Sequence, residues 1–150
     1  PAFALMELGL PTAQWGFGLV GELPFALTFQ EFCATLASKV GRRFYQLIGP
    51  RPETVQRVSY CTGSGSSFME AAAGSGADVF ITGDMKYHQA LEAPLCVVDV
   101  GHFILEEEMM RRFAQQLAEV PQLAEVELLF FAGQDPFDLL ILDEAPGESL

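Results

Sequence analysis

The sequence predicts an α/β fold, built on a mainly parallel β-sheet with flanking helices. Beyond the Gly49–Pro50 break, four apolar segments typical of strands alternate with three segments that show helical periodicity. Such alternation implies right-handed crossovers between parallel strands. The strand segments end in glycine-containing polar loops, which read TGSGSS, TGD, VGH and AGQDP. We expect these four loops to share one edge of the sheet, where ligands bind in such folds. The length of 150 residues fits a single domain.

The first expected helix begins after Thr28. Residues 1–26 are rich in glycine and proline, and we interpret them as extended chain broken by turns. Thr28 and Glu31 have the spacing of a capping box, in which each side chain satisfies a backbone donor of the first turn. Apolar residues then recur at helical spacing from Phe29 to Val40, and Gly41 is suited to end the helix.

The expected strands cover residues 55–61, 78–82, 95–100 and 125–132, and the helices cover about residues 67–73, 85–92 and 103–118. The third strand is nearly all apolar, which is typical of a strand buried on both faces. In the last helix an apolar residue recurs every four positions, which predicts a stripe packed against the sheet. The stripe consists of Leu105, Met109, Phe113 and Leu117.

Charge and composition exclude several classes of partner. Twenty acidic residues face eight basic ones, for a net charge of −12, and most of the excess lies after residue 98. A surface this acidic repels a phosphate backbone and an anionic membrane, so we expect no nucleic-acid and no membrane partner. The three cysteines form no C-x-x-C motif, which favours buried free thiols and a cytoplasmic location.

Two pairs of polar residues lie four positions apart in the loops after strands. His102 and Glu106 stand where a strand meets a helix, and an imidazole and a carboxylate at this spacing can bind one divalent cation. Asp99, just upstream, could add a further donor. Asp84 and His88 repeat the spacing and are candidates for acid–base catalysis or substrate binding. The alternatives are helix capping for Asp84 and His102 and a favourable dipole interaction for Glu106.

The loop of Gly63, Ser64, Gly65 and Ser66 precedes an expected helix. Backbone donors at such a junction can hold a phosphate group, so these four residues are candidates for binding a nucleotide. The loop lacks the lysine of a P-loop and the glycine spacing of a dinucleotide fingerprint. A tight turn without a ligand is the alternative.

Taken together, five segments resemble the Nif-three-like family, also known as the GTP cyclohydrolase I type 2 homologues. They read GFGLVGELP, CTGSGSSFMEAA, GADVFITGDMKYHQAL, DVGHFILEE and QDPFDLL, and span about residues 15–140. The resemblance implies a three-layer α/β fold and a toroidal homo-oligomer, typically a hexamer. It also implies two divalent metal ions per subunit, without distinguishing zinc, manganese, iron or magnesium.

The resemblance assigns roles residue by residue. His102 and Glu106 match metal-ligating positions, whereas Asp84 and His88 match a motif beside the metals. The family's other ligands lie in a preceding half, so we expect this chain to correspond to the C-terminal half of a longer, two-lobed protein. Leu19 stands where an arginine is usual, which removes a possible anion contact. The function implied is metal-dependent hydrolysis of a nucleotide or phosphorylated small molecule; a non-enzymatic toroidal scaffold and a nucleotide-binding module are the alternatives.

Overall fold

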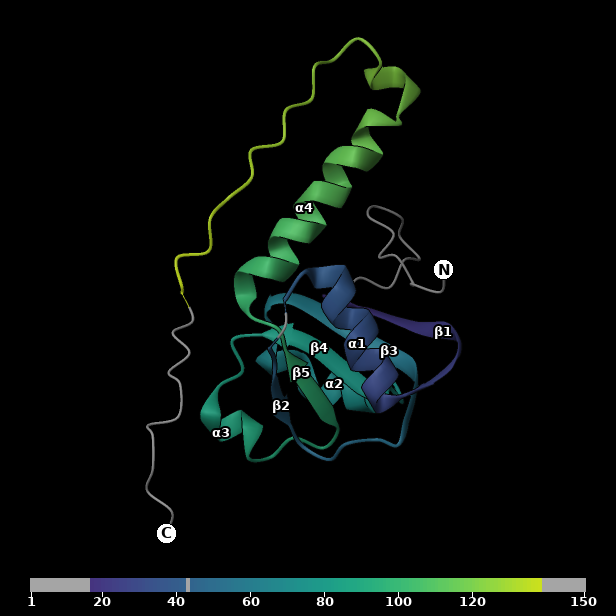
Figure 1. Ribbon diagram of the computed structural model, residues 1–150, viewed down its shortest axis with the longest axis vertical. Helices are drawn as coiled ribbons and strands as arrows, with labels where there is room; N and C mark the ends of the chain where they lie inside the picture. The colour runs from purple at the N-terminus through teal and green to yellow at the C-terminus, as the bar shows by residue number, and fades with distance from the viewer. Residues whose placement is uncertain (1–16, 43, 139–150) are drawn as a thin grey trace, which may run out of the picture.

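The computed structural model describes residues 17–42 and 44–138. Five strands form one sheet with the order β1-β3-β4-β5-β2 (Figure 1). The strands are β1 (Leu19–Thr28), β2 (Gln46–Ile48), β3 (Thr54–Ser64), β4 (Val79–Gly83) and β5 (Cys96–Asp99). The α-helices are α1 (Phe29–Val40), α2 (Met69–Gly74), α3 (Tyr87–Ala90) and α4 (His102–Ala118).

The sheet is mixed, which corrects the prediction of a mainly parallel sheet. The central strands β3, β4 and β5 are parallel, as the alternating pattern predicts. Both edge strands are antiparallel to their neighbours: β1 pairs with β3, and β2 pairs with β5. Most of β1 lies in a stretch that the sequence predicts as extended chain broken by turns, and β2 is only three residues long. Neither edge strand carries the continuous apolar run by which a buried strand is recognised.

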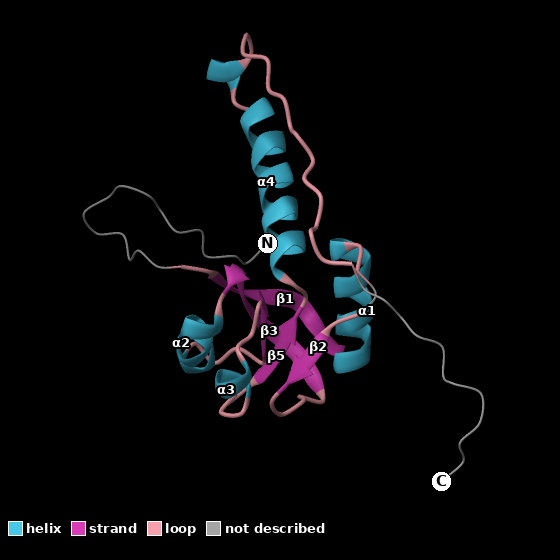
Figure 2. Cartoon of the chain, turned by 90° about the vertical axis from the view of Figure 1, so that its left-hand side faces the viewer, coloured by secondary structure: helices cyan, strands magenta, loops and turns pink. Residues whose placement is uncertain are grey.

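Helices cover both faces of the sheet, so the domain has three layers. α1 and α4 lie on one side, and α2 and α3 lie on the other (Figure 2). Phe32 of α1 and Leu105 of α4 belong to the buried cluster on the first face. Met69 and Ala72 of α2 belong to the cluster on the second face. Consecutive residues of β4 and β5 point alternately into the two clusters, which is why these strands are apolar throughout.

The predicted boundaries of α1 are confirmed. The Glu31 carboxylate accepts a hydrogen bond from the Thr28 backbone at 2.9 Å, and the Thr28 hydroxyl accepts one from the Glu31 backbone at 3.3 Å. At the other end Gly41 adopts φ +68° and its N–H donates to Ala37. The helices and the three central strands predicted from residue 55 to residue 118 also agree with the structure to within three residues at each end.

The predicted strand at residues 125–132 is wrong. After a short 3₁₀ turn (Pro121–Leu123) this segment runs as extended chain beside α4, without pairing to any strand (Figure 1). The edge strands of the five-stranded sheet are β1 and β2, and this segment extends the sheet at neither edge. Its apolar side chains, Leu129 and Phe131 among them, are largely exposed.

The predicted apolar stripe on α4 is buried only at its beginning. Leu105 is 9% exposed, whereas Met109 is 43% and Phe113 is 50% exposed. α4 projects past the end of the sheet, so only its first turns have a surface to pack against (Figure 1). Within the described chain, no helix is long and apolar enough to cross a membrane.

Candidate functional site

The loops after β3, β4 and β5 meet at one end of the sheet. The Val100 N–H donates to the Thr82 carbonyl at 2.9 Å, which joins the ends of β4 and β5. The Gly65 N–H donates to the Thr82 hydroxyl at 2.9 Å, which joins the loop after β3 to β4. A Cβ on Gly83 would stand 2.6 Å from the Gly101 carbonyl carbon, so these loops touch through backbone. Three of the four polar loops therefore cluster at the edge where the sequence analysis places them.

His102 lies at the centre of this edge, between two carboxylates. Its Nδ1 atom is 2.6 Å from Oδ2 of Asp84, in the loop after β4. Its Nε2 atom is 3.3 Å from Oε1 of Glu106, one helical turn further along α4. The spacing of His102 and Glu106 thus places both on one face of α4, as predicted. All three side chains are about half exposed, so they are open to a ligand from solvent.

The two carboxylates raise the pKa of His102. The hydrogen bond that His102 donates to Asp84 is the largest cause, because a carboxylate stabilises the imidazolium form. The negative charges of Glu106 and Asp84 act in the same direction, whereas partial desolvation opposes them. A cation that binds at Nε2 therefore competes with a proton for this nitrogen.

Asp84 holds its position through the neighbouring loops. Its backbone has φ +51°, in the left-handed region that non-glycine residues rarely adopt. The hydroxyls of Ser64 and Ser66 donate to its carbonyl oxygen at 3.5 and 3.3 Å. Next to it, the N–H of Met85 donates to the buried Asp99 carboxylate at 2.8 Å. Contacts from the ends of β3 and β5 thus hold the backbone of this turn in place.

Asp99 ties two loops together. Its other oxygen accepts the Gly101 N–H at 2.9 Å, so the carboxylate bridges the loops after β4 and β5. Asp99 is 7% exposed, and both of its oxygens are occupied by backbone donors. A structural role explains it better than the metal donor that the sequence suggested.

The donor set fits part of the coordination shell of a divalent cation. With Nδ1 bound to Asp84, His102 has Nε2 left to offer, close to Oε1 of Glu106. Gly63, at φ +65°, leaves the space beside these atoms open, since a Cβ there would be 2.8 Å from Oε1 of Glu106. No group of three or more His, Cys, Asp or Glu side chains in the described ranges could hold a metal ion. The described residues therefore contribute two donors of the four to six that a cation needs.

His88 makes no hydrogen bond or ion pair with the described residues of this cluster. It is exposed on α3, and its ring meets the Tyr87 ring edge-on at 5.6 Å. No hydrogen bond or ion pair within the described chain joins it to Asp84 or His102. Asp84 precedes α3, which begins at Tyr87, so the spacing of Asp84 and His88 does not place them on one helical face. The catalytic role of His88 stays a prediction.

The glycine–serine loop has internal partners for several of its donors. The Gly65 N–H and the hydroxyls of Ser64 and Ser66 are bonded within the site, to Thr82 and Asp84. The loop leads into a single 3₁₀ turn (Ser66–Phe68) before α2 begins. These contacts support the adjacent Asp84 turn, and phosphate binding by the loop stays a prediction.

Arg42 lies beside the site, although the sequence does not predict it there. Its Nη1 donates to the Val100 carbonyl at 2.7 Å, and its Nη2 is 3.9 Å from the Asp135 carboxylate. The guanidinium also lies over the Phe44 ring, 4.3 Å from its centroid. Arg42 thus joins the end of α1 to the end of β5 and to the QDP segment. A contact between residues 42 and 100 has no local sequence signal.

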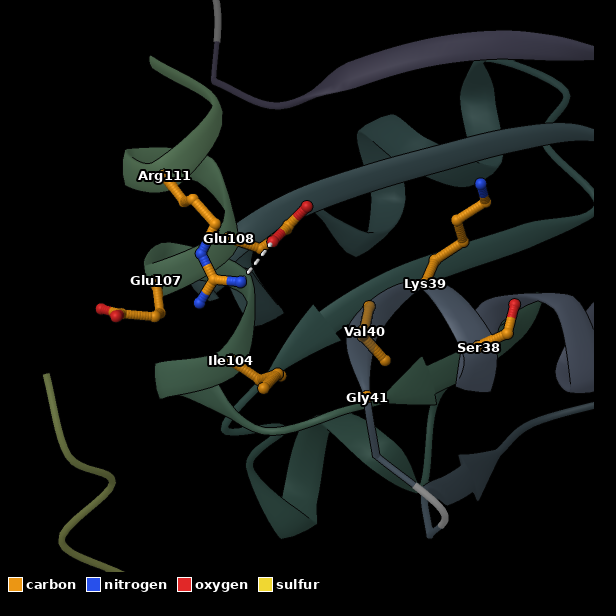
Figure 3. Close-up of a pocket in the computed structure, with 8 residues that line it drawn as sticks. All are labelled: Ser38, Lys39, Val40, Gly41, Ile104, Glu107, Glu108 and Arg111. Carbon is orange, nitrogen blue, oxygen red and sulfur yellow. Dashed lines mark ion pairs between the residues drawn. The ribbon is translucent and has the colours of Figure 1, made fainter. Parts of the chain in front are cut away.

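A separate pocket of about 290 Å³ lies between the end of α1 and the side of α4. Figure 3 shows Lys39 on one wall, with Glu107, Glu108 and Arg111 on the other. Arg111 forms an ion pair with Glu108 at 3.8 Å. The lining includes neither His102 nor its two carboxylate partners, so the pocket is distinct from the loop cluster.

Comparison with known proteins gives consistent matches. A family model described as Duf34/NIF3 (NGG1p interacting factor 3) matches residues 5–136. A "GTP cyclohydrolase 1 type 2 homolog" of Listeria innocua is 32% identical over 143 residues, which cover 91% of this chain and 38% of that protein. A Staphylococcus aureus protein with the same description is 31% identical over 106 residues, 69% of this chain and 29% of its own length. The chain thus spans about a third of these relatives.

Solved structures share the fold. A Staphylococcus aureus crystal structure matches with a TM-score of 0.72 and 27% identity, covering 83% of this chain and 42% of that one. A Bacillus cereus protein described as related to NIF3 matches with a TM-score of 0.71 and 29% identity, covering 87% and 38%.

Proposed function

This chain belongs to the Duf34/NIF3 family, and we propose that it carries part of the divalent-metal site of a metal-dependent hydrolase. The observation that carries the proposal is the pair formed by Nε2 of His102 and Oε1 of Glu106, 3.3 Å apart at the strand-end edge. Gly63 keeps the space beside the pair open. The name of the relatives, GTP cyclohydrolase 1 type 2 homolog, supports hydrolysis as the reaction class.

In this proposal His102 and Glu106 each supply one ligand atom. The chemistry that a divalent cation supplies, when bound, is Lewis-acid activation of water near neutral pH. His88, exposed on α3, moves a proton to or from the substrate. An imidazole and a carboxylate do not select among zinc, manganese, iron and magnesium. Two such ions per subunit, as the resemblance implies, require ligands beyond this pair.

The proposed substrate is a nucleotide or another phosphorylated small molecule. Water would attack a purine ring carbon or a phosphorylated group, with the loop at Gly63–Ser66 beside the phosphate. We also propose that the protein is a cytoplasmic homo-oligomer. The resemblance to the family implies that this oligomer is a hexamer.

Calorimetric titration with Zn²⁺ or Mn²⁺ tests the metal site. The titration is run in about 0.15 M salt, which screens diffuse attraction between exposed charges beyond about 8 Å. We expect weak binding, because two protein donors leave most of the shell to water. His102→Ala and Glu106→Gln should abolish it, whereas His88→Ala and Glu107→Gln, which remove the other imidazole and a neighbouring charge, should retain it. Tight binding that survives His102→Ala would show that the ligands lie elsewhere.

A second candidate function is that of a non-enzymatic scaffold. It is favoured by the apolar surface that α4 and the segment after it expose, including Met110, Phe113 and Phe131. Metal binding distinguishes the two candidates. Zn²⁺ binding that disappears in the His102→Ala variant supports the hydrolase, and oligomerisation without any Zn²⁺ binding supports the scaffold.

A further inference from the structure

Asp84 adopts an unusual backbone conformation at the centre of the site. It is the one non-glycine residue with positive φ in the described part of the chain. Strained residues persist where surrounding contacts hold them, and they concentrate at functional sites. Here the contacts are the Ser64 and Ser66 hydroxyls on its carbonyl and the Asp99 carboxylate on the next N–H.

In this conformation Asp84 makes a short contact with His102. Oδ2 of Asp84 lies 2.6 Å from Nδ1 of His102. An ionised carboxylate can only accept a hydrogen bond, so Nδ1 must carry the proton. In a neutral ring the lone pair then lies on Nε2, the nitrogen that faces Glu106. A free neutral histidine prefers the opposite tautomer, with the proton on Nε2.

We propose that Asp84 is a positioning residue that fixes the tautomer and orientation of His102, and that the Ser64–Ser66 loop holds Asp84 in place for this purpose. The benefit of this tautomer rests on the proposed function, since a ring with a free Nε2 is the form that binds a cation. It replaces direct proton transfer as the role of Asp84. Carboxylates in this position commonly orient metal-binding histidines.

Nitrogen NMR of the metal-free chain tests the tautomer directly. The chain contains only two histidines, so ¹⁵N-histidine labelling gives two sets of ring signals, and His88 serves as the internal reference. Spectra are recorded at increasing pH until the ring signals stop changing, so that they report the neutral rings. We expect His102 to show the Nδ1–H tautomer and His88 the Nε2–H tautomer.

Asp84→Gly removes the carboxylate while retaining a residue that tolerates positive φ, so the fold should survive. We expect His102 to revert to the tautomer of His88, and Zn²⁺ affinity to fall by about 10–100-fold. Ser64→Ala combined with Ser66→Ala should shift the tautomer partially, whereas Ser67→Ala, in the same loop but without a hydrogen bond to Asp84, should not.

Two results would overturn the positioning role: an Nε2–H tautomer at His102 in the unmodified chain, or an Nδ1–H tautomer that persists in Asp84→Gly. The expected tautomers without Zn²⁺ binding by the unmodified chain would instead support the positioning role and refute the proposed metal site.

Discussion

Gly101 joins β5 to α4 at a backbone conformation that favours glycine. Its φ is +88°, and a Cβ at this position would collide with the Arg42 guanidinium. Arg42 in turn donates to the Val100 carbonyl, so the collision would disturb the end of β5 as well. A single residue without a side chain therefore permits the approach of α1 to the strand end that carries His102.

We expect Gly101→Ala to lower the free energy of unfolding by about 2 kcal/mol, through backbone strain and displacement of Arg42. Urea denaturation measures this. Gly74→Ala is the matched control, because no atom lies within 4 Å of the added Cβ and its φ is not positive. Equal stability of the two variants would contradict this account.

His102 makes the stability of the chain depend on pH. Its pKa is raised in the folded state, chiefly by the hydrogen bond that the ring donates to Asp84, so folding favours the protonated ring. The stabilisation is fully present below the unfolded pKa of about 6.5 and is lost as pH rises through the raised folded value. Its size is limited because the ring is half exposed to solvent.

We therefore expect the unfolding free energy of the unmodified chain to fall as the pH rises above about 6.5. In the His102→Gln variant this fall should be absent. Urea denaturation at a series of pH values measures the slope. A His102→Gln profile parallel to that of the unmodified chain would refute the assignment.

At the scale of elements, α1 shows how local signals determine a helix. Its capping box satisfies backbone donors at the first turn, and Gly41 ends the last turn in the left-handed conformation. Both devices depend on residues within a few positions of each other. α4 shows the opposite case, because its periodicity is clear but its burial depends on where the sheet ends.

We expect Thr28→Ala to destabilise the chain by about 1 kcal/mol, the usual cost of losing an N-cap side chain. Thr35→Ala is the matched control in the same helix. The Thr35 hydroxyl bonds to the Glu31 carbonyl within the helix, and alanine has the higher helix propensity, so no loss is expected there. Thermal unfolding compares the two variants, and equal midpoints would argue against the capping box as a source of stability.

The whole molecule exposes an apolar surface on its projecting part. Phe113 of α4 and Phe131 of the extended segment are exposed, as are Met110 and Leu129 near them in sequence. Large apolar side chains that are exposed together in one part of a molecule often mark an interaction site. The extended segment also has backbone groups that no strand of the described chain pairs.

We expect the chain to self-associate through this surface, with a sedimentation coefficient that rises with concentration in the micromolar range. Phe113→Glu combined with Phe131→Glu should shift the chain towards monomer. Leu91→Glu adds a charge at an exposed apolar residue after α3 and should leave association unchanged. A monomeric unmodified chain at these concentrations would contradict the prediction.

The sequence alone predicts those contacts of the candidate site that depend on local spacing. The pairing of His102 with Glu106 follows from one helical turn, and the meeting of three strand-end loops follows from strand–helix alternation. Asp84 is identified as a polar residue of the site, but its contact with Nδ1 of His102 depends on a backbone conformation that no spacing reveals. The supporting contacts from Ser66, Asp99 and Arg42 join different loops and elements, so they too escape sequence analysis.

The sequence by itself determined the α/β class, the central strands and the caps of α1, because periodicity, capping and turn residues act within a few positions. Only the tertiary structure decided that β1 and β2 close the sheet as antiparallel edges, that α4 projects beyond it and that residues 125–132 pair with no strand of the described chain. Edge pairing and burial depend on which surfaces are still free when distant elements meet. A segment with the pattern of a strand becomes one only if a partner edge is available.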